Sequence, residues 1–133
     1  REGQVAVHHI TGTEDVMSYR AIPGIVYTDP EIAAVGQTEQ ELRTAGIDYE
    51  VHRVPMTLSG RFIIENEQGN GFCKLLTDKD GVILGAHLFG NGSSEILVPA
   101  IMAVEQRMKL SELSRIVFPH PTVCEIVRSA TLH

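Results

Sequence analysis

Basic residues and long apolar runs are both scarce in this chain of 133 residues. The sequence has 11 Lys and Arg against 17 Asp and Glu, so its formal net charge is −6 and its pI is about 5.4. Nucleic acids and anionic membrane surfaces both require a basic face, and the charge therefore argues against either as a partner. The longest apolar run, 96–104, contains Pro99 and is far shorter than the roughly 20 residues of a spanning helix. The sequence predicts neither a nucleic-acid partner nor a membrane segment.

Cysteine is rare as well. Cys73 and Cys124 stand in unrelated surroundings and show no zinc-type spacing with histidine. They could pair only if the fold brought them together, so we expect a reduced, cytoplasmic protein without a metal site. The chain begins at Arg1 and lacks the basic, apolar and small-residue pattern of a signal peptide, which indicates a piece of a longer protein.

What is present is the composition of one folded domain. Hydrophobic residues make up 43% and charged residues 21% of the chain, close to the globular norm, and this length allows a sizeable core. The first part predicts a helix at residues 1–10 that ends at Gly12. A connection over 13–24 and extended segments at 25–28 and 32–36 follow.

The middle of the chain carries two helix and turn signals. Thr38 and Glu41 are spaced as a capping box, and Gly46 ends the helix that they begin. A strand is expected over 48–56, and a loop or short helical turn over 58–62.

A hairpin is the clearest structural feature of the sequence. Two strands, 71–77 and 82–89, flank the turn 78–81, in which Asp78 favours turn initiation and Gly81 accepts a positive φ.

The C-terminal part predicts helices. One spans 96–108, with Pro99 delaying its start or bending its first turn. A second spans 110–117 with Ser111 as N-cap, and a third begins at Thr122. Strands followed by helices indicate an α+β fold, an antiparallel β-sheet covered by helices. The apolar stripe expected to form core or a dimer seam is Leu97, Ile101, Val104 and Met108.

His120 is the candidate for chemistry. It stands between two prolines, which restrict its backbone, and the His120–Pro121 bond is a fair candidate for the cis form. Glu125 is expected near the entry of the next helix, where its carboxylate can bond one imidazole nitrogen. That bond fixes the tautomer and leaves the other nitrogen as a general base.

A purely structural interpretation is available for the same residues. Thr122 and Glu125 have capping-box spacing, so Glu125 could serve only to cap the helix, and His120 could be a partly buried loop residue. Four other histidines lack any partner pattern, and ordinary surface or core roles are expected for them: His8, His9, His52 and His87.

Several ordered segments together resemble one family. The run 118–125, Phe-Pro-His-Pro-Thr-Val-Cys-Glu, is similar to the His-Pro-Thr…Glu signature of the pyridine nucleotide-disulfide oxidoreductases. Residues 1–6 resemble the end of the helix that closes the family's flavin domain. The order of the other motifs is that of the dihydrolipoamide dehydrogenases within this family; these motifs are 27–39, 59–62, 71–74 and 83–87.

The resemblance implies a domain organisation and an activity. It implies the tail of a flavin-domain helix over 1–12, a connection over 13–24 and a dimerisation (interface) domain over 25–133. It also implies that His120 and Glu125 form the general base for oxidation of dihydrolipoamide by NAD⁺, through FAD and a redox disulfide, in the active site of the partner subunit. The implied partners are a second copy of the chain, its own flavin and nicotinamide domains, and lipoyl domains of 2-oxo acid dehydrogenase complexes or the glycine cleavage H protein.

The chain departs from the family in what it lacks. No Gly-x-Gly-x-x-Gly follows a strand, and Cys73 and Cys124 do not match the family's redox pair. We therefore expect no cofactor-binding residue beyond an approach of the His120–Pro121 backbone to the partner's flavin, and no activity from this piece alone. Two alternatives remain: the same domain of another flavin disulfide reductase, of the glutathione reductase kind, or a dimerisation module without catalysis.

Overall fold

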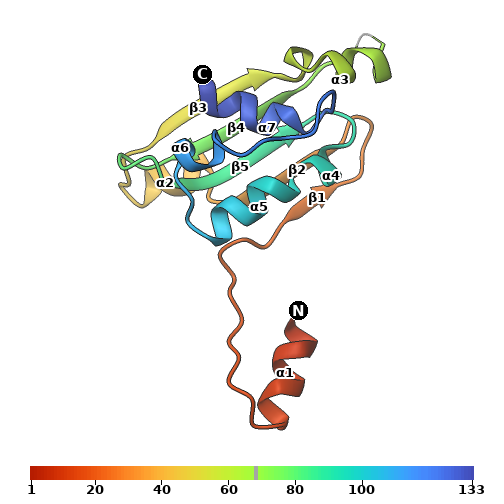
Figure 1. Cartoon of the computed structure of the whole chain (residues 1–133). Helices are drawn as coiled ribbons and strands as arrows, with labels where there is room; N and C mark the ends of the chain where they lie inside the picture. Colours follow the sequence, from red (N-terminus) through yellow and green to blue (C-terminus); the bar gives the residue numbers. More distant parts are fainter. Residues whose placement is uncertain (68) are drawn as a thin grey trace.

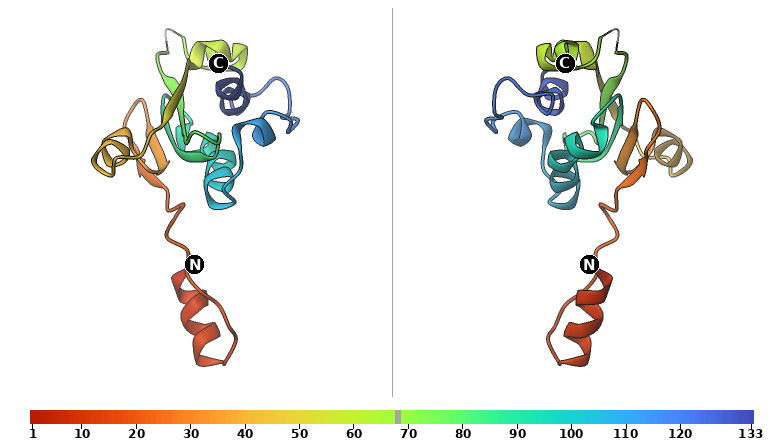
Figure 2. Two further views of the ribbon diagram at one scale, coloured as in Figure 1. Left: turned by 90° about the vertical axis from the view of Figure 1, so that its left-hand side faces the viewer. Right: turned by 90° about the vertical axis from the view of Figure 1, so that its right-hand side faces the viewer.

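The computed structural model describes residues 1–67 and 69–133 and sets the N-terminal helix apart from the rest of the chain (Figure 1). This helix, α1 (Glu2–Ile10), has no buried residue, and an extended segment leads from it to the sheet (Figures 1 and 2). Asp15 in that segment contacts Arg1 and lies 2.6 Å from Nδ1 of His8. No sequence pattern indicated this contact, which gives His8 an ordinary surface role. These exposed ion pairs tie the segment back to α1, although each adds little stability.

A five-stranded sheet forms the body of the molecule. The strands lie in the order β1-β2-β5-β4-β3, and every neighbouring pair is antiparallel. With helices packed on it, the sheet confirms the predicted α+β class. The strands are β1 (Gly24–Val26), β2 (Ile32–Gly36), β3 (Glu50–Pro55), β4 (Phe72–Thr77) and β5 (Ile83–Phe89).

Strands β4 and β5 form the predicted hairpin, and its turn shows why Asp78 and Gly81 stand at their positions. Oδ1 of Asp78 accepts hydrogen bonds from the amides of Asp80 and Val82, each at 2.9 Å. Gly81 has a φ of 78°, a conformation that costs glycine little.

The strand predicted over 25–28 is shorter, because the chain turns directly after Val26. The hydroxyl of Thr28 donates to the carbonyl of Pro30 at 2.8 Å, and the Asp29–Pro30 peptide is cis. This local turn uses Thr28 for its own hydrogen bond and returns the chain into β2.

The capping box forms as predicted at α2 (Glu39–Thr44). The Thr38 amide donates to Glu41 at 2.8 Å, and the Glu41 amide donates to the Thr38 hydroxyl at 3.2 Å. The segment after β3 is more helical than expected. It forms a 3₁₀ turn, η1 (Met56–Leu58), followed by α3 (Gly60–Glu65), for which Ser59 is the N-cap.

The helix predicted over 96–108 is two shorter helices. α4 (Ser93–Ile96) starts earlier, after Gly92, and α5 (Val98–Glu105) carries a proline in its first turn, where the missing N–H costs nothing. α5 ends early because Arg107 takes a φ of 53° and the Met108 amide turns back to the Ala103 carbonyl at 2.9 Å.

Two further helix boundaries differ from the sequence prediction. α6 (Leu110–Leu113) is short, and its N-cap is Lys109, whose amide donates to Glu112 at 2.7 Å. Ser111, predicted as N-cap, lies inside α6. The last helix, α7 (Glu125–Ser129), starts after Cys124 rather than at Thr122, and η2 (Ala130–Leu132) extends it.

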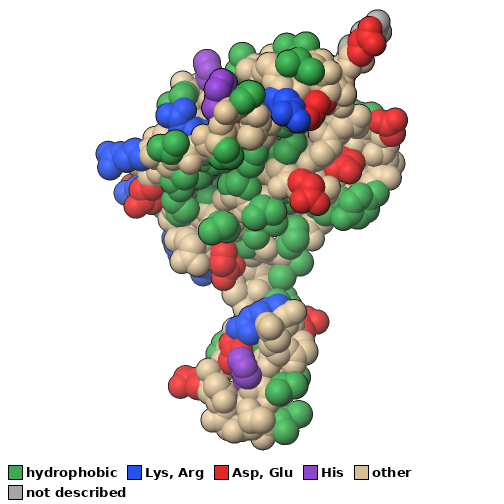
Figure 3. All heavy atoms as spheres, turned by 45° about the vertical axis from the view of Figure 1, so that its right-hand side comes forward, with side chains coloured by type: hydrophobic (Ala, Val, Ile, Leu, Met, Phe, Trp, Pro, Cys, Tyr) green, Lys and Arg blue, Asp and Glu red, His purple; other side chains and the backbone are tan. Residues whose placement is uncertain are grey.

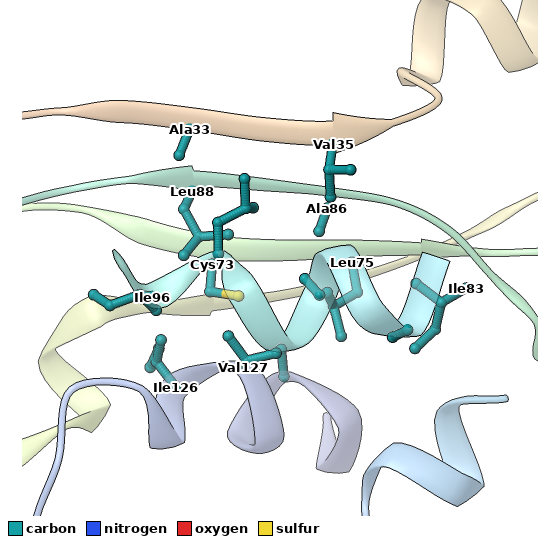
Figure 4. Close-up of a cluster of buried hydrophobic side chains, with 14 of the residues drawn as sticks. Ala33, Val35, Cys73, Leu75, Ile83, Ala86, Leu88, Ile96, Ile126 and Val127 are labelled. Carbon is teal, nitrogen blue, oxygen red and sulfur yellow. The ribbon is translucent and has the colours of Figure 1, made fainter. Parts of the chain in front are cut away.

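Helices α5, α6 and α7 cover one face of the sheet, while α2 lies on the other side (Figures 1 and 2). Between the sheet and the helices lies an apolar core, in which Cys73 and Leu75 of β4 face Ile126 and Val127 of α7 (Figure 4). The predicted helical stripe belongs to this core, because Leu97 and Val104 are buried and Ile101 and Met108 pack against them. The core therefore fixes α7, and with it the chain that enters α7, against the sheet.

Candidate functional site

The loop that carries His120 runs from α6 to α7. Its His120–Pro121 peptide is cis, as the sequence suggested. The side chain of His120 is 80% exposed, so the ring projects outward and does not pack into the body of its own domain. An exposed ring on a proline-restricted loop is accessible to a second molecule.

Glu125, the first residue of α7, supports this ring. Nδ1 of His120 lies 3.1 Å from Oε1 and 3.0 Å from Oε2 of the carboxylate. With Nδ1–H donating to the carboxylate, Nε2 is the unprotonated nitrogen of the neutral ring and faces away from Glu125. The structure thus brings together the two residues that the sequence singled out.

Glu125 also accepts a backbone amide at the entry to α7, so one carboxylate contacts both the imidazole ring and the chain before the helix. Its Oε2 accepts the Thr122 amide at 3.0 Å. That amide first, and then the His120 ring and the Arg128 charge, hold the pKa of Glu125 below its ordinary value. The capping box that this spacing suggests is incomplete, however, because the Thr122 hydroxyl donates to the Pro119 carbonyl at 2.8 Å and does not accept the Glu125 amide.

The backbone of Thr122, the residue after Pro121, is held on both of its sides. While Glu125 accepts the Thr122 amide, the hydroxyl of Ser59 donates to the Thr122 carbonyl at 3.2 Å. Ser59 is buried and also accepts the Phe62 amide at 3.3 Å as the N-cap of α3. Between α3 and the histidine loop lies a groove of about 340 Å³, whose lining includes Leu58, Ser59, Arg61, Ile64, His120 and Glu125.

This arrangement can move a proton. A neutral imidazole with one nitrogen held by a carboxylate takes up a proton at the other nitrogen, and the carboxylate stabilises the cation that results. The geometry suits a substrate that brings an ionisable group to the exposed side of His120. Sequence reasoning singled out the imidazole and its carboxylate but missed Ser59, which it had placed in a loop or turn without a role.

The two cysteines do not form a disulfide in this structure. Cys73 is fully buried in the core, and burial raises the pKa of its thiol to about 12. Burial, followed by the charge of Glu125, raises the pKa of the Cys124 thiol as well. Both thiols therefore sit in surroundings that disfavour the reactive thiolate.

Three further features concern metal binding, membrane spanning and the remaining histidines of the sheet. Within residues 1–67 and 69–133, no cluster of three His, Cys, Asp or Glu side chains could hold a metal ion. Over the same ranges, no helix has both the length and the apolar character to cross a membrane. His52 contacts the Thr77 hydroxyl at 3.1 Å, and both ring nitrogens of His87 are buried without a hydrogen bond.

Comparison with known proteins identifies the domain. The family model of the pyridine nucleotide-disulphide oxidoreductase dimerisation domain matches residues 22–131. Among curated relatives, the mitochondrial dihydrolipoyl dehydrogenase of Caenorhabditis elegans is 35% identical over 132 residues, which are 98% of this chain and 26% of the relative. The dihydrolipoyl dehydrogenase of Geobacillus stearothermophilus is 37% identical over 130 residues, 97% of this chain and 27% of the relative.

Solved structures agree with the observed fold. LpdA from Mycobacterium tuberculosis superposes with a TM-score of 0.87 at 25% identity, over 98% of this chain and 29% of LpdA. The HOCl-induced flavoprotein disulfide reductase RclA from Escherichia coli gives a TM-score of 0.82 at 24% identity, over 96% of this chain and 29% of RclA. The chain thus spans between a quarter and a third of each of these proteins. The matched residues and the five-stranded sheet together show that this chain belongs to the dimerisation-domain family of the pyridine nucleotide-disulphide oxidoreductases.

Proposed function

We propose that this domain provides the general base of a dihydrolipoamide dehydrogenase, with His120 as the base and Glu125 as the residue that orients it. The observation that carries the proposal is the hydrogen-bonded pair itself, 3.0 Å between Nδ1 and Oε2, on an exposed ring. The curated relatives named above are dihydrolipoyl dehydrogenases, and this supports the choice of a dithiol substrate.

The proton chemistry follows from the geometry. A free thiol ionises near pH 8.5, so only a few per cent is thiolate at neutral pH. Nε2 of His120 takes the proton of one substrate thiol, and Glu125 stabilises the imidazolium that forms. The thiolate then attacks one sulfur of a disulfide, forms a mixed disulfide and releases the other sulfur as a thiolate. When the second substrate thiol closes the cyclic disulfide of lipoamide, the enzyme's disulfide has become a dithiol.

The acceptors of the two electrons lie outside this chain in our proposal. FAD and NAD⁺, bound by other segments, would be the acceptors of these two electrons. Dinucleotide sites of this class use a parallel strand–helix–strand unit with a glycine-rich turn, whereas the strand pairings described here are antiparallel. The residues of this domain therefore do not fit a dinucleotide cradle, and both cofactors are assigned to other segments of a longer protein.

We propose further that the active protein is a homodimer and that the face carrying α5 and α6 takes part in it. A groove of about 320 Å³ lies there, lined almost entirely by apolar side chains that include Met102, Ile116 and Val117. The exposed fraction of Val117 is 92% and that of Met102 is 61%, which is unfavourable unless another surface covers them. Figure 3 shows hydrophobic side chains gathered on one face of the body. The groove includes Pro119, so the same contact would place His120 next to the second protomer.

The natural substrate would be presented by another protein. Dihydrolipoamide is a small group on a long arm, and an exposed histidine beside an open groove suits a carrier that docks and withdraws. We propose lipoyl domains of 2-oxo acid dehydrogenase complexes, or the glycine cleavage H protein, as these carriers, in a reducing compartment that suits two free cysteines.

The test is turnover of dihydrolipoamide with NAD⁺ by the full-length protein that contains this domain. His120→Ala should lower kcat/KM by about 10²–10⁴, the usual contribution of a general base. The control is His9→Ala, because His9 is exposed on α1, remote in sequence from the loop. Near-normal turnover by His120→Ala would remove His120 from the mechanism. Reduction of glutathione disulfide with no lipoamide activity would favour the related reductase instead.

A further inference from the structure

We infer that Ser59 is a positioning residue for His120. This inference rests on the proposed function and extends it to a second segment of the chain, the start of α3. The motif 59–62 carried part of the family resemblance, yet the mechanism above gives none of its residues a role. In the structure its first side chain reaches 63 residues along the sequence to bond the histidine loop.

Ser59 itself is held in place by burial and by two local hydrogen bonds. It is only 7% exposed, and its amide donates to the Met56 carbonyl at 3.0 Å. Its hydroxyl oxygen accepts the Phe62 amide at 3.3 Å, and the side chains of Met56 and Phe62 are both buried in the core. The hydroxyl is therefore anchored to the packed part of the domain.

This anchored hydroxyl fixes the histidine loop at one defined point. It donates to the Thr122 carbonyl at 3.2 Å, whereas Glu125 accepts the amide of the same residue at 3.0 Å. The Thr122 side chain meanwhile bonds the Pro119 carbonyl at 2.8 Å. Every polar group of Thr122 is thus engaged, and Thr122 is separated from His120 by one proline.

The position of the loop affects the direction of the His120 ring. The ring of His120 is 80% exposed, so little packing holds it, and its direction depends on Glu125 and on the backbone of its loop. Glu125 serves the ring and the Thr122 amide with the same carboxylate oxygen, Oε2. If Thr122 shifts, its amide and the imidazole can no longer both reach that oxygen. Ser59 holds the Thr122 carbonyl, limits this shift and so keeps Nε2 in its direction.

The experiment compares two reactions of the full-length protein. One is dihydrolipoamide oxidation by NAD⁺, which needs the base. The other is reduction of ferricyanide by NADH, which withdraws electrons without any thiol deprotonation. Ser59→Ala should lower kcat of the first reaction about tenfold, because one positioning hydrogen bond is lost, while the second changes by less than about twofold. Ser59→Thr retains the hydroxyl and should recover most of the lost turnover.

Two further variants control for folding. Ser93→Ala removes another buried hydroxyl, which donates to the Gly90 carbonyl at 2.6 Å, and it should leave the ratio of the two activities unchanged. Ser59→Gly removes the same hydroxyl as Ser59→Ala but leaves an acceptable N-cap, so it serves if the alanine variant folds poorly.

The outcomes separate this inference from the proposed function. Equal losses in both reactions, or undiminished lipoamide turnover in Ser59→Ala and Ser59→Gly, would overturn the role of Ser59. If His120→Ala is inactive in the same assay, the general base survives that result. If His120→Ala is fully active, the proposed function fails, and the role of Ser59 fails with it.

Discussion

Nδ1 of His120 and the carboxylate of Glu125 are 3.0 Å apart, although one lies in an exposed loop and the other begins a helix. The helix belongs to the core through Ile126 and Val127, both fully buried directly after Glu125. Packing of α7 against the sheet therefore sets the position of the carboxylate, and the carboxylate sets the direction of the ring. The geometry of the pair therefore depends on the packing of α7 as well as on the loop.

Glu125→Gln should separate orientation from capping. The amide oxygen can still accept the Thr122 N–H, but the negative charge that stabilises the imidazolium is gone. The amide NH₂ can also donate to Nδ1, which favours the tautomer that carries its proton on Nε2. Turnover of dihydrolipoamide by the full-length protein should fall by about tenfold or more. Glu112→Gln is the matched control, because Glu112 also accepts the amide three residues before it, without a histidine. Equal activity of both variants would argue against a role for the charge.

The lowered pKa of Glu125 predicts that its contribution to the free energy of unfolding depends on pH. The pKa of Glu125 is lowered by the Thr122 amide first and then by His120 and Arg128, so its contribution is complete above the unfolded value of 4.5. It is lost as the pH falls through the lower folded pKa. Urea unfolding of the wild type and of Glu125→Gln should therefore differ at pH 5 and converge towards pH 3. Other carboxylates titrate in both proteins and cancel in this difference. A difference in unfolding free energy that stays constant down to pH 3 would contradict a stabilising role of the Glu125 charge.

Local signals in the sequence were sufficient for much of the fold. The capping box of Thr38 and Glu41 and the turn at Asp78 and Gly81 depend on neighbouring residues alone, and both form as predicted. Helix lengths after residue 90 were predicted less well. Arg107 ends α5 through a positive φ that its residue type does not favour, and no local pattern indicates this.

The candidate site shows the same division. Its two close members, His120 and Glu125, are five residues apart and could be found from spacing and resemblance. Ser59 is 63 residues away from the Thr122 carbonyl that it bonds, so only the packing of η1, which directly precedes Ser59, beside α7 reveals the contact. Thr122 illustrates a different limit, since its hydroxyl bonds Pro119 and not the helix that its spacing predicted.

The isolated chain of 133 residues should bind no flavin. Its strand pairings are antiparallel and offer no parallel strand–helix–strand cradle for a dinucleotide. Purification of the chain in the presence of excess FAD, followed by gel filtration and an absorbance spectrum, is the measurement. A protein peak that retains the yellow absorbance of flavin at a one-to-one ratio would refute the assignment of the cofactor to other segments.

Gly85 should not tolerate a side chain. A Cβ at this position would lie 2.1 Å from the Gln37 carbonyl oxygen, where the chain leaves β2 beside β5. Gly85→Ala should therefore destabilise the chain by about 1–3 kcal/mol, since backbone must move to make room. Gly24→Ala in β1 is the control, because nothing lies within 4 Å of a Cβ there, and its effect should stay below about 1 kcal/mol. Thermal unfolding of both variants would decide, and equal midpoints would contradict the predicted clash.

The two cysteines should behave as structural thiols and not as a redox pair. Cys73 is fully buried with a pKa of about 12, and burial and the charge of Glu125 raise the pKa of the partly buried Cys124. Because the thiolate is the reactive form, iodoacetamide at pH 8 should label Cys124 slowly and Cys73 only after urea unfolds the chain. Glu125→Gln removes the neighbouring charge and should speed the labelling of Cys124 alone. Mass spectrometry of timed samples measures both rates. Rapid loss of both thiols to a Cys73–Cys124 disulfide would mean that this chain carries a redox pair of its own, contrary to the proposed mechanism, in which the disulfide comes from another segment.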